Sequence, residues 1–179
     1  RQRLAPDAGS AELEQLEQRE VATRQQRDQA NARLHRHRQM TGERLKQSLM
    51  TLLRPMGLAD GRFEVQLQPD QPAEHGADLV RFLFSANPGQ PLEPLVDVAS
   101  GGEMSRFLLA LKTLLAGIDG SSTLLFDEID AGVSGRISGA MGELLRSMAR
   151  HRQVFCVTHQ PLVAALADHH YRVSKEVVD

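Results

Sequence analysis

The spacing of apolar side chains divides the chain into a helical first part and a second part in which strands and helices alternate. Residues 11–53 contain no proline and one glycine, and most are Glu, Gln, Arg, Ala or Leu, which are strong helix formers. Apolar residues recur there at helical spacing, at Leu13, Leu16, Leu45, Leu49 and Leu52. This stripe is too thin for a folded core, and it favours one strand of a narrow antiparallel coiled coil.

Both ends of the long helix carry boundary signals. Ser10 follows two helix breakers and is expected to cap the start, while Pro55 and Gly57 are expected to end the helix. Glutamates gather early in the helix and arginines later. A stripe that faces DNA is one interpretation. The arginines do not share one helical face, however, so a solvated coiled-coil surface is favoured.

The second part follows the pattern of an α/β domain. Residues 63–67 alternate strictly, and residues 79–84 are expected to pair with them across a loop rich in proline and glycine. The predicted elements that follow are a helix over 102–115, a strand through Phe126, a helix over 134–149, a strand over 154–157, a short helix from Pro161 and a final strand over 171–173. Alternating strands and helices predict a mostly parallel sheet with flanking helices.

Composition narrows the class of protein without identifying it. The 179 residues, of which 41% are hydrophobic, suit one ordinary domain with an appendage, and no apolar run is long enough for a membrane span. The net charge of -2 gives no reason to expect nucleic-acid binding by the surface as a whole. The single cysteine, Cys156, excludes an internal disulfide, and its apolar neighbours predict a buried structural thiol.

Two predicted strands end in residues that suit phosphate chemistry. One ends in Asp127 and Glu128 and the other in His159, and ligands of open α/β sheets gather at such strand ends. Asp127 is suited to hold Mg²⁺ through its waters, and Glu128 to orient and deprotonate an attacking water. His159 is suited to donate a hydrogen bond to a γ-phosphate. The alternative for His159 is a cap on the turn before Pro161.

A glycine turn precedes these strands. Ser100, Gly101, Gly102 and Glu103 lead into a predicted helix, and the exposed backbone N–H groups of such a turn can cradle a phosphate. An ordinary glycine turn into a helix is the simpler interpretation when the motif is taken alone. Asp130 lies on a turn just past the two acids, and Ser134 is expected to cap the next helix.

One part of a nucleotide site is missing. A P-loop needs a glycine directly before its lysine, but Leu45, Leu111 and Ser174 precede the lysines of this chain. The chain is therefore not expected to form a complete ATP site by itself. Because it starts at an arginine, we expect it to be a piece of a longer protein.

Together the motifs resemble those of ABC-type ATPases. Residues 100–103 are similar to the signature motif, 124–128 to Walker B, 129–132 to the D-loop and His159 to the switch histidine. Glu103 and the upstream coiled coil indicate the SMC/Rad50/RecN branch. Residues 82–89, 98–106, 126–136 and 156–161 are similar to the RecN family of bacterial DNA repair proteins. The resemblance covers nearly all of 57–173, and the preceding helix matches in position and composition alone.

The resemblance implies a division at residue 57. Residues 1–57 would be the second strand of an antiparallel coiled coil and its re-entry to the head, and residues 58–179 the C-terminal lobe of an ABC ATPase head. The partners implied are the protein's own N-terminal lobe with Walker A, a second copy and DNA, with no membrane. The location implied is the cytoplasm, in association with the nucleoid.

The resemblance also implies roles for single residues. An ATPase of double-strand break repair would sandwich ATP and Mg²⁺ between two heads. Asp127, Glu128 and His159 would serve the nucleotide of their own head, Ser100, Gly101, Gly102 and Glu103 would face the nucleotide across the dimer, and Asp130 would couple the two sites. This chain alone is predicted to be inactive.

Two other functions remain open at this point. One is a different ABC-type ATPase, either another SMC-like protein or the nucleotide-binding subunit of a transporter, and the residues that precede Arg1 would decide. The other is a non-enzymatic coiled-coil scaffold with a degenerate site. The presence together of Asp127, Glu128 and His159 argues against degeneration.

Overall fold

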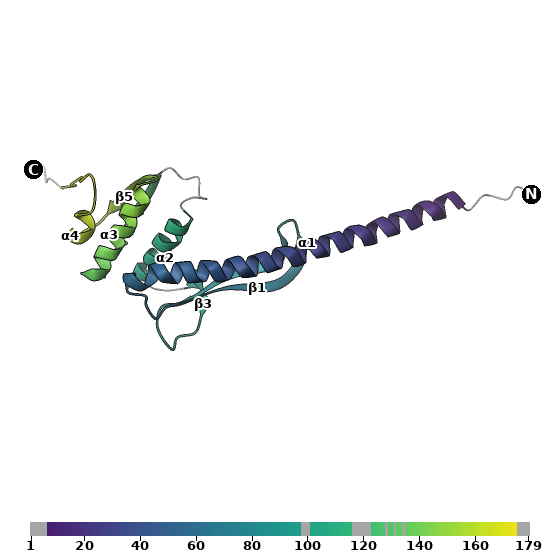
Figure 1. Ribbon diagram of the computed structural model, residues 1–179, viewed down its shortest axis with the longest axis horizontal. Coiled ribbons are helices and arrows are strands. Elements are labelled where there is room, and N and C mark those ends of the chain that lie inside the picture. Colours follow the sequence, from purple (N-terminus) through teal and green to yellow (C-terminus); the bar gives the residue numbers. More distant parts are fainter. Residues whose placement is uncertain are drawn as a thin grey trace, which may run out of the picture. The chain divides into compact units, whose positions relative to one another are not determined.

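The computed structural model describes residues 7–97, 101–115, 123–127, 129–130, 132–133 and 135–174. The chain begins with one long helix and continues into short strands and helices (Figure 1). The elements are α1 (Asp7–Leu53), η1 (Arg54–Met56), β1 (Arg62–Ala73), β2 (Gly76–Ser85), β3 (Glu93–Pro94), η2 (Leu95–Asp97), α2 (Gly101–Leu114), β4 (Thr123–Asp127), α3 (Arg136–Ala149), β5 (Gln153–Val157) and α4 (Pro161–Ala164).

The long helix predicted from composition is present and begins earlier than expected. It starts at Asp7, so Ser10 lies inside α1 and the prediction that it caps the start is wrong. A glycine in a first helical turn, here Gly9, costs about 1 kcal/mol, which a helix of this length tolerates. The end is as predicted, because Pro55 falls in η1 and Gly57 takes a left-handed conformation with φ of 81°.

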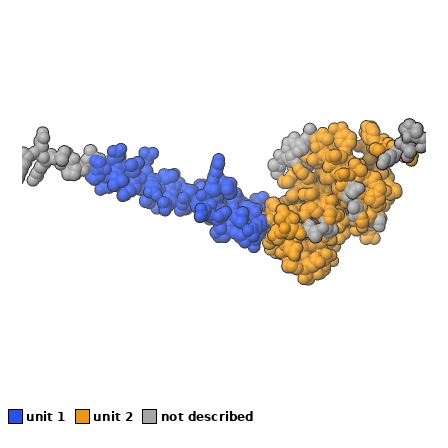
Figure 2. Space-filling model, turned by 180° about the vertical axis from the view of Figure 1, so that it is seen from behind, with its two compact units in different colours: residues 1–42, 66–81 blue, residues 43–65, 82–179 orange. Residues whose placement is uncertain are grey.

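The chain forms two compact units, which Figure 2 shows in different colours. The first consists of residues 1–42 and 66–81, and the second of residues 43–65 and 82–179. In the first unit, the buried carboxylate of Asp78 accepts hydrogen bonds from His35 Nδ1 at 2.7 Å and from Arg38 Nη1 at 3.1 Å. Arg38 Nη2 also donates to the carbonyl of His75 at 2.6 Å. These contacts fix the tip of the β1–β2 hairpin on α1.

The hairpin is longer than the sequence predicts. The expected loop rich in proline and glycine is mostly strand, because β1 continues to Ala73 through Pro69 and Pro72, and β2 resumes at Gly76. The sheet order is β1-β2-β3, which makes β1 an edge strand. Prolines are tolerated on an edge because no neighbouring strand needs their missing N–H groups.

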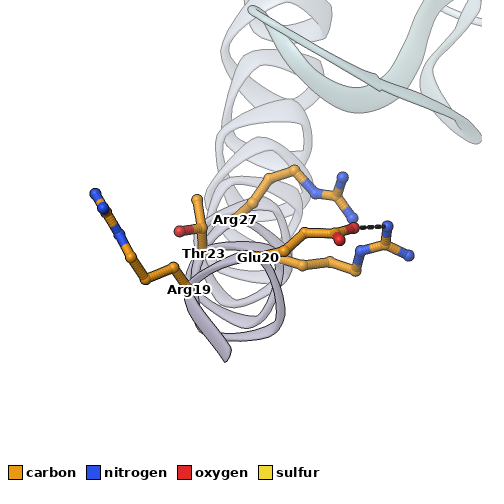
Figure 3. Close-up of a pocket in the computed structure, with 5 residues that line it drawn as sticks. Arg19, Glu20, Thr23 and Arg27 are labelled. Carbon is orange, nitrogen blue, oxygen red and sulfur yellow. Dashed lines mark hydrogen bonds and ion pairs between the residues drawn. The ribbon is translucent and has the colours of Figure 1, made fainter. Parts of the chain in front are cut away.

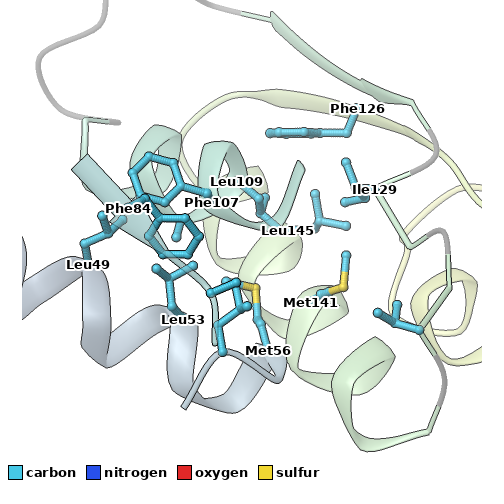
Figure 4. Close-up of a cluster of buried hydrophobic side chains, with 14 of the residues drawn as sticks. Leu49, Leu53, Met56, Phe84, Phe107, Leu109, Phe126, Ile129, Met141 and Leu145 are labelled. Carbon is cyan, nitrogen blue, oxygen red and sulfur yellow. The ribbon is translucent and has the colours of Figure 1, made fainter. Parts of the chain in front are cut away.

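The core of the second unit is built from aromatic and aliphatic side chains of several elements. Phe107 of α2 packs against Phe63 and Phe84 of the antiparallel sheet, with ring centroids 5.4 Å and 5.2 Å apart. Leu49 and Leu53, from the last turns of α1, are fully buried in the same cluster (Figure 4). Burial of a side chain of this size contributes about 1.5–3 kcal/mol, so the end of α1 belongs to the core.

The predicted α/β fold with a parallel sheet is confirmed. Strands β4 and β5 pair in parallel, with Leu124 opposite Val154 and Asp127 opposite Val157. The three-stranded sheet is separate, and β2 and β3 run antiparallel in it. The predicted strand over 171–173 is absent. A strand needs a neighbour for its backbone hydrogen bonds, and no described segment pairs with these residues.

The remaining helices follow the predicted pattern with small shifts. α2 and α4 lie where the apolar spacing places them. The N-cap position of α3 is Gly135, so the role expected for Ser134 does not apply, and Ser134 itself lies outside the described residues. Within the described part of the chain, no helix is both long and apolar enough to cross a membrane.

Candidate functional site

The parallel register of β4 and β5 brings two of the predicted site residues to one edge of the sheet. Asp127 is the last residue of β4 and lies opposite Val157, the last residue of β5. His159 follows two residues later, and the side chains of Asp127 and His159 are both exposed. Glu128, the expected base, lies outside the described residues.

Asp130, in the loop after β4, contacts the segment that follows β5. Its carboxylate is fully buried, and Thr158 Oγ1 donates a hydrogen bond to Asp130 Oδ2. The other oxygen, Oδ1, lies 3.6 Å from His159 Nδ1. Sequence reasoning placed Asp130 on the turn but missed Thr158. The only signal for Thr158 is that it directly precedes the histidine at the strand end.

The turn before Pro161 is held by Thr158, and this contact bears on the alternative in which His159 caps the turn. The backbone N–H of Gln160 donates to Thr158 Oγ1 at 3.0 Å, so the threonine hydroxyl performs the capping role. The imidazole of His159 remains 67% exposed, with Gln160 Nε2 at 3.2 Å from its Nε2. His159 is therefore available to a ligand at the strand ends.

Cys156 lies beside this site as an unreactive thiol. It is opposite Phe126 in the sheet, and burial is the main cause that raises the pKa of its thiol to about 11. The carboxylates of Asp130 and Asp127 raise the pKa further. A thiol with this pKa is protonated at neutral pH, which suits a structural cysteine. Cys156 is only partly buried, so the prediction of a buried thiol is wrong in this respect.

The glycine turn lies on a different element, at the start of α2. Ser100 is outside the described residues, while Gly101 and Gly102 are the first two residues of the helix. Gly101 is exposed, and a Cβ added there would meet nothing within 4 Å. Ser105 Oγ donates to the Gly101 carbonyl at 2.8 Å, within the first turn of the helix.

Arg106 and Glu103 form the charged part of this helix start. Arg106 is buried, and its burial lowers the pKa of the guanidinium, while the charge of Glu103 acts in the opposite direction. Glu103 itself is half-buried. Its place next to a buried arginine indicates a role in holding the helix start together.

The charged residues of α1 form a solvated surface. Figure 3 shows the side chains of Arg19 and Arg27 extending in different directions around a depression that Glu20, Thr23 and Arg24 also line. Glu20 and Arg24 form an ion pair at 2.7 Å along the helix. Exposed pairs of this kind contribute about 0–1 kcal/mol. The prediction that the arginines do not form one DNA-facing stripe stays a prediction.

One face of the parallel sheet is bare in the part of the chain that the structure describes. Leu125, Phe155 and Val157 point away from the core and are 69%, 42% and 54% exposed, whereas Phe126, on the other face, is buried. Parallel sheets are normally covered on both faces. An exposed apolar face of this kind is a candidate contact surface.

Comparison with known proteins gives one consistent result. Over 96% of its length the chain is 42% identical to a protein named DNA repair protein RecN of Synechocystis sp., and over 93% it is 39% identical to the protein of that name from Xylella fastidiosa. Over 63% of its length it is 47% identical to that of Bacillus subtilis. The chain spans about 30% of the length of the first two relatives. No model of a protein family matches it.

Solved structures share the fold at low sequence identity. The Smc head domain with a coiled coil and joint from Pyrococcus yayanosii matches 89% of the chain with a TM-score of 0.58 and 18% identity, over 29% of that protein. The Smc head domain with an extended coiled coil from Pyrococcus furiosus, bound to the C-terminal domain of ScpA, matches 70% with a TM-score of 0.54 and 19% identity, over 30% of its own length. The fold is therefore that of part of an SMC head domain.

Proposed function

Because the chain belongs to the RecN family of bacterial DNA repair proteins, we propose that it is the C-terminal part of an SMC-like ATPase that acts in DNA double-strand break repair by recombination. Residues 1–57 form the second strand of an antiparallel coiled coil and its re-entry to the head. Residues 58–179 form the C-terminal lobe of the head.

The residues at the strand ends fit a magnesium nucleotide. The exposed carboxylate of Asp127 offers the hard oxygen ligand that Mg²⁺ prefers, and His159 presents an exposed imidazole beside it. A bound Mg²⁺ would supply charge neutralisation for phosphoryl transfer. Asp127 holds the ion, Glu128 orients and deprotonates the attacking water, and His159 donates a hydrogen bond to the terminal phosphate of ATP.

The glycine turn serves a second nucleotide, on a partner head. Ser100, Gly101, Gly102 and Glu103 approach a nucleotide bound by a second copy, so that ATP holds two heads together as a homodimer. The open space at Gly101 supports this role, because no described residue of this chain lies close enough to require a glycine there. Asp130 lies within the segment similar to the D-loop and contributes to coupling between the two sites.

The protein's own N-terminal lobe supplies what this chain lacks. It carries the Walker A lysine, and it covers the bare face formed by Leu125, Phe155 and Val157. ATP binding then engages the heads, and hydrolysis releases them while the coiled coil transmits the state to DNA. We place this cycle in the cytoplasm, at the nucleoid.

The observation that carries the proposal is the shared strand edge of Asp127 and His159. Its test is the variant Glu128→Gln in the full-length protein. The variant is expected to bind ATP with unchanged affinity and to accumulate as a dimer, because the water is no longer deprotonated. Nucleotide binding and sedimentation measure the two effects. A variant that hydrolyses ATP at the wild-type rate would remove Glu128 from the role of base.

A further inference from the structure

Asp130 and His159 form a pair whose role within one chain the proposed function leaves open. Asp130 Oδ1 lies 3.6 Å from His159 Nδ1, within ion-pair distance and longer than a hydrogen bond. No hydrogen-bond donor reaches this buried oxygen from the described residues. A buried carboxylate oxygen is costly to leave without a partner, and the imidazole is the group that faces it.

The other oxygen of Asp130 is fixed to the segment that carries His159. Thr158 Oγ1 donates its proton to Asp130 Oδ2 and accepts the backbone N–H of Gln160. A hydroxyl can donate once and accept at the same time, so the two hydrogen bonds are compatible. They run continuously from the loop after β4 to the turn after β5. The carboxylate therefore has a fixed position relative to the backbone on both sides of His159.

The two neighbours of the imidazole favour the same tautomer. A carboxylate accepts and does not donate, so a hydrogen bond between His159 and Asp130 needs the proton on the ring nitrogen that faces the carboxylate, Nδ1. The amide nitrogen of Gln160 donates and does not accept, so the neutral ring offers a lone pair at Nε2, 3.2 Å away. In histidine sites the partner of one ring nitrogen determines what the other nitrogen can do.

We propose that Asp130 is a positioning residue for His159, resting on the proposed function for the role of the histidine itself. Asp130 keeps the proton on Nδ1 and turns Nε2 toward the place where a terminal phosphate binds. A ring that donates to a phosphate from Nε2 while Nδ1 keeps its proton is an imidazolium, and the carboxylate next to it balances that charge. This role is exercised within one chain and is distinct from coupling between two heads.

A spectroscopic measurement tests the positioning without any turnover. The ¹⁵N chemical shifts of the His159 ring in the full-length protein, at a pH where the ring is neutral, report which nitrogen carries the proton. We expect Nδ1–H in the wild type and a larger share of Nε2–H in Asp130→Asn. A wild-type ring with the proton on Nε2 overturns the proposal, whether or not the variant folds.

A kinetic cycle tests whether Asp130 acts through His159. In the full-length protein, Asp130→Asn is expected to lower kcat for ATP about 10-fold to 100-fold, as loss of a supporting partner does. The KM for ATP is expected to stay near the wild-type value. The double variant Asp130→Asn/His159→Ala should hydrolyse ATP within about twofold of His159→Ala alone. Asp168→Asn, which changes an exposed aspartate after α4, is the matched control and keeps the wild-type kcat.

The cycle separates failure of this inference from failure of its premise. Suppose that His159→Ala has a low kcat and that adding Asp130→Asn lowers this kcat by the same factor as Asp130→Asn lowers that of the wild type. Asp130 then acts independently of His159, and the positioning role is overturned. If His159→Ala has the wild-type kcat, the role of His159 in hydrolysis is wrong, and the inference falls with it.

Discussion

At the scale of single residues, two aspartates near the end of one strand have opposite environments. Asp127 is exposed at the end of β4, whereas Asp130, three residues later, is fully buried against Thr158. An exposed carboxylate is free to meet a cation and its waters. A buried one with a fixed hydroxyl partner is suited to orient a neighbour. This short spacing in the sequence therefore corresponds to a difference in environment, which suits the different roles that we propose.

Gly101 offers a residue-scale test of the contact between heads. The variant Gly101→Asp places a carboxylate at the first residue of α2. A negative charge at this positive end of the helix dipole stabilises the helix by about 0.3–1 kcal/mol. The variant is expected to fold as well as the wild type. ATP-dependent dimerisation of the full-length protein is expected to be lost, because the new charge repels the partner's nucleotide.

The control for this variant is Gly139→Asp. Gly139 lies in the first turn of α3, and a Cβ there also meets nothing within 4 Å. It places the same charge near another helix start and is expected to leave dimerisation unchanged. Light scattering with and without ATP measures both. If Gly101→Asp dimerises at the same ATP concentrations as the wild type, the glycine turn does not face a nucleotide.

At the scale of elements, the bare face of the β4–β5 sheet is the feature that most needs a partner. Leu125→Asp changes a side chain that is 69% exposed, so the chain by itself is expected to keep its stability within about 0.5 kcal/mol. Binding to the N-terminal lobe is expected to weaken about tenfold or more, because a charge would enter an apolar contact. Calorimetric titration measures the affinity.

Leu162→Asp provides the comparison, because Leu162 is an exposed leucine on α4. It is expected to leave the affinity for the N-terminal lobe unchanged. Equal effects of the two substitutions would show that the sheet face is not the surface that the lobe covers.

The tip of the hairpin provides a pH-dependent test at the same scale. The hydrogen bond from His35 is the main cause that lowers the pKa of Asp78, and Arg38 acts in the same direction against the effect of burial. The stabilisation is therefore present at neutral pH and is lost as the pH falls below about 4, toward the lowered pKa. Asp78→Asn is expected to melt a few degrees below the wild type at pH 7, and the difference should vanish in acid.

Asp70→Asn, which changes an exposed aspartate of the same hairpin, is the control for this experiment and is expected to melt like the wild type. Thermal unfolding followed by circular dichroism at several pH values measures all three proteins. A difference between wild type and Asp78→Asn that persists unchanged at low pH would contradict the role of the ionised carboxylate.

Much of the candidate site could be predicted from the sequence because it lies on regular elements. The apolar runs that end at Asp127 and before His159 predict two strands, and parallel pairing then places their ends together. The contact of Asp130 with Thr158 could not be predicted, since it depends on the path of a loop between two elements. The strand expected at Tyr171 does not form, because a strand needs a partner that no described segment provides.

At the scale of the whole molecule, the chain has Asp127 and His159 at one edge of its parallel sheet and an exposed apolar face on the same sheet. None of its lysines follows a glycine, as a P-loop requires. The relatives that it matches are about three times as long. We propose that one partner, the N-terminal lobe of the full-length protein, supplies the P-loop and covers the exposed surface of Leu125 and Phe155.

The measurement that tests this account most directly is ATP turnover by the chain alone and after addition of the N-terminal half of the protein. The chain alone is expected to show no turnover, because none of its lysines lies in a P-loop that could hold the phosphates. Addition of the N-terminal half is expected to restore Mg²⁺-dependent hydrolysis. Significant turnover by the isolated chain would contradict the account.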